Sequence, residues 1–196
     1  MLSAFALPTP RKLLHDAARI YDHDAELQRA ATLAWRNGFA SGAQWMAMAL
    51  SRVRGSHSSI VCNEGREPRR YQALGILKYA LAATAAAACL FAGILLRSAL
   101  LIASAPILFY VAEVQTLFLF PCALDGSATP FRDSRALLRR AGGTLRATAT
   151  VMVLATVMLF GGLFGRGFVR CWCLGCLAVC ICYDAVLHLP RGGSAQ

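Results

Sequence analysis

Charged residues are scarce in this chain of 196 residues. They make up 15% of it, whereas hydrophobic residues make up 57%, and the mean hydropathy is +0.52. Soluble globular domains carry about 25% charged residues, so this composition lies outside their range. Acidic residues are the fewest, ten against twenty Lys and Arg, which leaves a formal net charge of +10. The basic residues stand beside apolar segments and form no stripe interleaved with aromatics, so we expect a membrane protein with no nucleic-acid partner.

The sequence also lacks the motifs of common hydrolases and nucleotide-binding enzymes. It contains no GxSxG, no HExxH, no P-loop and no other glycine-rich phosphate-binding sequence. We also expect no secretory signal peptide, because the apolar residues 1–7 have no basic segment before them and run directly into Pro8. Internal segments are therefore expected to insert the chain into the membrane.

Four apolar segments fill the second part of the chain, each long enough to cross a hydrocarbon layer of about 30 Å. They cover residues 73–96, 99–122, 147–165 and 168–189. Only Arg97 and Ser98 separate the first two, which indicates a tight helical hairpin, and a run of alanines in the first would allow close helix packing. The predicted fold class is all-α: a polytopic membrane protein with a four-helix transmembrane bundle at 73–190 and a short tail at 191–196.

Residues 1–72 are more polar and predict an amphipathic helical region in the cytoplasm or at the membrane surface. Thr9 suits the N-cap of a helix with Pro10 as its first residue. Residues 11–36 then show apolar side chains at helical spacing, and a second helix is expected at about 40–53. We expect the apolar faces to lie against the membrane or a partner, with an independent small domain as the alternative.

The arginines predict the orientation. The flank before the first apolar segment is basic, and the polar loop expected at 125–146 carries Arg132, Arg135, Arg139, Arg140 and Arg146. The turns at 97–98 and 166–170 carry one and two arginines. The positive-inside rule then places both termini and the central loop in the cytoplasm. Arginine far exceeds lysine and alanine is abundant, as in GC-rich bacterial genomes, so we expect the bacterial inner membrane.

The last apolar segment carries five of the eight cysteines. On a helix at about 100° per residue, Cys173, Cys176, Cys180 and Asp184 fall on one narrow face, which we call the thiol stripe. A carboxylate inside a membrane span is costly and usually faces a partner. Three thiols on one face would also suit a soft metal, but His188 lies off the stripe, so we expect no metal site.

Cys173 and Cys176, within the sequence RCWCLGC, form a CxxC pair at the outer beginning of a helix, where the helix dipole favours the thiolate. This arrangement resembles the membrane thiol oxidoreductases of the vitamin K epoxide reductase type, which have a four-helix core and pass electrons to quinone. The resemblance implies a redox-active Cys173 and Cys176 with quinone as cofactor. The chain departs from that pattern at the outer turn Arg97-Ser98, which lacks the cysteine pair needed to relay electrons.

Lys78, Glu113 and Asp184 are charged residues inside the predicted spans. At a rise of 1.5 Å per residue, Lys78 and Asp184 would each lie roughly 7 Å deep and Glu113 roughly 13 Å deep. We predict that Lys78 pairs with Asp184, with Glu113 as a second acceptor, which would hold the first apolar helix against the fourth. The alternative is that Lys78 extends to the headgroups and Asp184 reaches water.

The function expected from these features is that of an integral membrane accessory, anchoring or assembly subunit. It would act through the lipid bilayer and other membrane proteins, without catalytic activity or a cofactor. A thiol–disulfide oxidoreductase that uses quinone is the alternative from a different class, and a component of a transporter or channel is the third possibility.

Overall fold

The computed structural model describes residues 8–55 and 68–189. These two stretches form helices and contain no strand, which confirms the all-α class. The helices are α1 (Pro10–His23), α2 (Ala25–Asn37), α3 (Phe39–Val53), α4 (Pro68–Leu95), α5 (Ala99–Val114), α6 (Leu119–Leu124), α7 (Pro130–Arg140), α8 (Gly143–Phe160), the π-helical turn η1 (Gly162–Arg166) and α9 (Phe168–Leu187).

The first amphipathic stretch forms two helices, so the prediction of one continuous helix at 11–36 was wrong. Thr9 does cap α1 as predicted, since its hydroxyl accepts a hydrogen bond from the Lys12 N–H at 3.3 Å. The break comes at Asp24, which has an extended backbone and accepts from the Leu27 N–H at 2.9 Å. An aspartate in that role begins a new helix, because it satisfies an N–H that the helix itself leaves unpaired.

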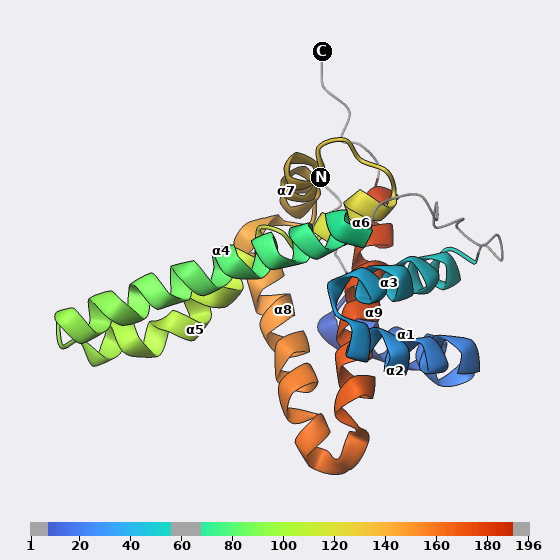
Figure 1. Ribbon diagram of the computed structural model, residues 1–196, viewed down its shortest axis with the longest axis horizontal. Helices are drawn as coiled ribbons and strands as arrows, with labels where there is room; N and C mark the ends of the chain where they lie inside the picture. The colour runs from blue at the N-terminus through green and yellow to red at the C-terminus, as the bar shows by residue number, and fades with distance from the viewer. Residues whose placement is uncertain (1–7, 56–67, 190–196) are drawn as a thin grey trace, which may run out of the picture.

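Helix α9 lies at the centre of the molecule. It packs against α1, α2 and α3 on one side and against α8 on the other, and α7 touches it as well (Figure 1). Its cysteines are buried on both faces: Cys173 and Cys180 on the thiol stripe, and Cys171 and Cys182 on the opposite side. Glycines bring α8 close to α9, because a Cβ added at Gly175 would lie within 2.1 Å of a methionine sulfur on α8.

The apolar face of the N-terminal helices is covered by this packing. Leu13 and Ala17 of α1 and Leu27 of α2 are almost fully buried, and they belong to the same core cluster as Leu177 of α9. The expectation that these apolar faces lie against the membrane or a partner was therefore wrong for these residues, which pack against α9 of the same chain. We call the assembly of α1–α3 and α6–α9 the head.

Helices α4 and α5 form the predicted hairpin, which projects away from the head in a different direction from α8 and α9 (Figure 1). Its two helices approach closely, since a Cβ added at Gly93 would lie 2.8 Å from the Ile102 side chain. Beyond its base the hairpin touches little else, and its large side chains are exposed; Leu100 is 80% exposed.

Four helical segments are long and apolar enough to cross a membrane, as predicted: Arg69–Leu95, Ala99–Leu124, Gly143–Phe160 and Phe168–Leu187. Their bounds agree with the predicted spans within a few residues, except that α8 ends at Phe160 and η1 follows. The polar loop predicted at 125–146 was wrong in part, because α7 begins there at Pro130 and buries Leu137 and Leu138 on one face.

Candidate functional site: a cavity between hairpin and head

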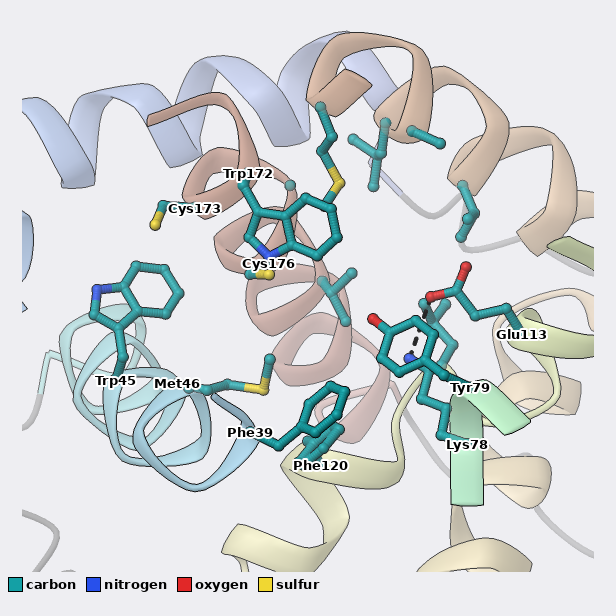
Figure 2. A pocket seen from close by; sticks show the side chains of 18 of the residues that line it. Phe39, Trp45, Met46, Lys78, Tyr79, Glu113, Phe120, Trp172, Cys173 and Cys176 are labelled. Atoms are coloured by element: carbon teal, nitrogen blue, oxygen red, sulfur yellow. Dashed lines mark ion pairs between the residues drawn. The ribbon is translucent and has the colours of Figure 1, made fainter. Parts of the chain in front are cut away.

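An apolar cavity of about 510 Å³ lies where the α4–α5 hairpin joins the head. Helices α2 and α3 form one wall, α8 and α9 another, and the base of α4 and α5 closes one end, with Phe120 of α6 below (Figure 2). Cavities of this size are typical of small-molecule sites in proteins. Leu159, which lines the cavity, is 45% exposed, so the cavity reaches the surface on the side of α8.

One end of the cavity is polar. Lys78 and Glu113 are the two charged residues of its lining, and they form an ion pair in which Nζ and Oε1 are 3.4 Å apart. Tyr79 lies beside them: Lys78 Nζ is 5.4 Å from the centre of its ring, and its hydroxyl points into the cavity (Figure 2). We call these three residues the polar corner. The Lys78 side chain is only 8% exposed, so the corner is well removed from solvent.

The opposite end of the cavity is aromatic and sulfur-rich. Trp45 and Met46 of α3 face Trp172 of α9 across it (Figure 2). The Trp45 indole is held in place by a hydrogen bond that its Nε1–H donates to the Leu27 carbonyl at 3.0 Å. Because that polar atom is satisfied within the head, the indole offers the cavity its apolar surface.

The thiol stripe reaches the cavity with two of its three cysteines. Cys173 and Cys176 line it, whereas Cys180 is fully buried elsewhere. All seven cysteines of the described residues are free thiols. Among those residues no group of three His, Cys, Asp or Glu side chains is placed to hold a metal ion.

The predicted pair between Lys78 and Asp184 was wrong. Lys78 pairs with Glu113, the expected second acceptor, while the Asp184 carboxylate accepts from Arg54 Nε at 3.2 Å. Helix α4 leaves the head at its contact with α3 and runs away from the C-terminal end of α9, so Lys78 does not reach Asp184 (Figure 1). Arg54 follows α3 directly, and no pattern in the sequence indicated a partner for it.

Arg54 also joins α3 to the residue after α6. Its guanidinium binds the Asp125 carboxylate through two hydrogen bonds of 2.9 and 2.7 Å, and the Tyr183 hydroxyl donates to Asp125 at 2.7 Å. Burial alone would raise the pKa of Asp125, but these donors outweigh it and hold that pKa below its usual value. The Asp125 hydrogen bonds raise the pKa of Arg54 despite burial. This network fixes the end of the head opposite to Arg170 and serves structure, since it does not line the cavity.

Comparison with protein-family models, with curated proteins and with solved structures found no match. The function of the site is therefore inferred from its own residues. An apolar cavity that ends in one neutral ion pair and a hydroxyl is suited to hold a molecule of low polarity.

Proposed function

We propose that this chain is a non-enzymatic membrane protein that is anchored by the α4–α5 hairpin and binds a lipid-soluble molecule in the cavity beneath it. The observation that carries the proposal is the combination of a cavity with a single charge pair and a projecting hairpin whose apolar side chains are exposed. The wider role as an accessory or anchoring subunit for other membrane proteins is compatible with it and stays a prediction.

The hairpin has the length and composition of a membrane anchor. Between the polar corner and its tip, residues 79–96 and 98–112 contain no Asp, Glu, Lys or Arg. The first of these stretches would be about 27 Å long as a helix, close to the roughly 30 Å of a hydrocarbon core. Arg97 at the tip would then reach the headgroups of the far leaflet.

Two ion pairs along α9 support a position of the head outside the hydrocarbon. Arg170, at the start of α9, donates to the Asp22 carboxylate at the end of α1, with Nη2 and Oδ2 2.7 Å apart. Asp184, near the other end of α9, binds Arg54 after α3. Helices α1 to α3 thus accompany α9 along most of its length, and the outer faces of α1 and α2 carry exposed charged residues such as Arg19 and Arg29. Lipid around such faces would be costly, so we place α9 in the core of a water-facing head.

This placement differs from the predicted four spans, although it keeps both termini in the cytoplasm. The head carries the arginines of α7, and Arg69 and Arg70 stand at the first turn of α4, next to the head, whereas the hairpin tip carries Arg97 alone. The positive-inside rule then puts the head in the cytoplasm, and the bacterial inner membrane remains the proposed site. The exposed apolar residues of α8 and η1, such as Leu163 and Phe164, would rest at the membrane surface in this placement.

Cysteine labelling in intact cells tests this proposal against four spans. Four spans would put the 97–98 turn and the η1 turn on the outer face, whereas the hairpin alone puts only the first there. We expect an impermeant maleimide to label Ser98→Cys in intact cells and Phe164→Cys only after permeabilisation, with the native chain as background control. Labelling of Phe164→Cys from outside would overturn the proposal.

A thiol–quinone oxidoreductase is kept as the second candidate because both Cys173 and Cys176 line the cavity. Such an enzyme needs the pair to cycle between thiol and disulfide. Trapping of thiols in intact cells with and without reductant measures that cycle directly. We expect no change in the labelling of the pair, and replacement of both residues by Ser is expected to leave binding nearly intact. A pair that is oxidised in cells would favour the enzyme instead.

A further inference from the structure

We propose that the molecule held in the cavity is a neutral amphiphile: an apolar body, such as one long hydrocarbon chain, with a hydroxyl head bound at the polar corner. This inference rests on the proposed function, since it names the class of ligand for the same cavity. It follows from the charge of the polar corner, from the lining of the rest of the cavity and from the position of its opening.

The polar corner selects a ligand whose polar group is uncharged. Lys78 and Glu113 together carry no net charge, and within the described residues each has only the other as ion-pair partner, at 3.4 Å. The ammonium has three N–H donors and the carboxylate about four acceptor sites, so both keep hydrogen-bonding capacity. A carboxylate or ammonium head would add an unbalanced charge to an apolar cavity, which is costly.

A hydroxyl fits this corner because it both donates and accepts. It can donate to the Glu113 carboxylate and accept from the Lys78 ammonium at the same time, and the Tyr79 hydroxyl lies on the same side of the cavity (Figure 2). A pure hydrocarbon would leave the remaining hydrogen-bonding capacity of the Lys78–Glu113 pair unused, and a ketone would satisfy only the donors. The corner therefore distinguishes alcohols from alkanes as well as from acids and amines.

The remaining lining suits an apolar body. The far end presents aromatic and thioether surface from Trp45, Trp172 and Met46, against which burial of a hydrocarbon chain is favourable. The cavity reaches the surface at Leu159, on the apolar face of α8 that would rest on the membrane. A molecule dissolved in the bilayer can enter there without crossing water.

Photolabelling with matched probes tests the proposal. The purified full-length chain in lipid nanodiscs is exposed to hexadecanol, hexadecanoic acid or hexadecane, each with a diazirine on its chain, and the labelled peptides are mapped. We expect the alcohol to label the α3 peptide around Trp45 and Met46 at least about tenfold more than the acid or the alkane does. Unlabelled hexadecanol should compete and hexadecanoic acid should not, a result that needs no variant. Equal labelling by alcohol and acid, or preference for the acid, would overturn the neutral-head proposal.

Two pairs of variants locate the hydroxyl group and the apolar body of the ligand in the cavity. Lys78→Met with Glu113→Leu removes both charges and should reduce alcohol labelling about tenfold, towards the level of the alkane. Ala155→Leu fills the cavity and should abolish labelling, whereas Ala149→Leu, on the exposed face of the same helix, should not change it. Unchanged labelling in Ala155→Leu would place the ligand elsewhere. A photoreagent confined to the bilayer labels the hairpin in the same samples if the hairpin is inserted. The proposed anchoring by α4–α5 and the proposed class of ligand are therefore tested by separate signals.

Discussion

Helices α4 and α9 are nearly equal in mean hydropathy, yet the structure uses them in opposite ways. In the most apolar window of α4 only 17% of the residues are buried within the molecule, against 56% in α9. Helix α4 is an alanine-rich helix that touches α5 along one side and presents large side chains outward. Helix α9 is surrounded, and small residues let its neighbours approach from both sides.

The cysteines explain part of this difference. Cys171 and Cys182 are buried on one side of α9, and Cys173 and Cys180 on the other. A free thiol is a small apolar group, so a helix with thiols on two faces can be packed from two directions. Hydropathy alone cannot separate a helix buried by lipid from a helix buried by protein, whereas the distribution of small residues around the helix can.

The largest expected difference between α9 and the hairpin lies in the cost of truncating a leucine. Leu177 of α9 is 0% exposed and Leu100 of α5 is 80% exposed. We expect Leu177→Ala to lower the free energy of unfolding by about 2–5 kcal/mol, because it leaves a cavity in the head. Leu100→Ala should change it by about 0.5 kcal/mol or less. Unfolding in detergent measures both, and equal losses would contradict the division into head and hairpin.

The ion pair at the base of the hairpin predicts a smaller effect. Lys78→Met alone leaves Glu113 without its cation in an apolar cavity, and we expect a loss of about 1–3 kcal/mol. Glu113→Leu alone should cost a similar amount. The double variant should cost less than the sum of the two, since neither charge remains alone.

A second double-mutant cycle serves as the control for this pair. Lys78→Met and Asp184→Asn should have additive effects, because Asp184 is bound by Arg54 and not by Lys78. Strong coupling between Lys78 and Asp184, with none between Lys78 and Glu113, would show that the hairpin joins the head differently.

The sequence predicted the local elements better than their arrangement. Thr9 and Pro10 marked the start of α1, and the two-residue Arg97-Ser98 turn marked the hairpin, because these signals depend only on neighbouring residues. Asp24 was read as part of one helix, although an aspartate can equally begin a second one. Pro130 in a basic stretch was likewise a helix-start signal that the high arginine content of the segment obscured.

The candidate site was also predicted only in part, because its geometry depends on which helices touch. Cys173, Cys176, Lys78 and Glu113 were singled out, and the structure places all four around one cavity. The partner of Lys78 was wrong, since choosing among partners requires knowing which helices touch. Trp45 gave no signal for the cavity at all, because the sequence suggested that α3 lies at the membrane surface and not against α9.

Acid should destabilise the head through two carboxylates. Burial alone would raise the pKa of Asp24, but the Leu27 N–H and Arg52 outweigh it and lower that pKa, as other donors do for Asp125. A lowered pKa in the folded state gives stability that is present above the unfolded value of about 3.9 and is lost as pH falls below it. We expect thermal stability in detergent to fall below about pH 4, by about 0.5–2 kcal/mol for Asp24. Asp24→Asn with Asp125→Asn should flatten this dependence, and an unchanged pH profile would contradict the assignment.

The smallest expected effect is at the pair Asp22–Arg170, which nevertheless decides where α9 lies. Both side chains are partly exposed, 44% and 35%, so the pair contributes only about 0.2–1 kcal/mol. Reversal of one charge, Asp22→Arg or Arg170→Asp, should lower stability by about that amount or slightly more, and the double reversal should restore most of it. Residues on opposite sides of a bilayer cannot rescue one another in this way. Rescue measured by thermal unfolding in nanodiscs would therefore place the start of α9 on the same side as α1. Simple additivity of the two reversals would separate α1 from α9 and return α8 and α9 to the set of membrane spans.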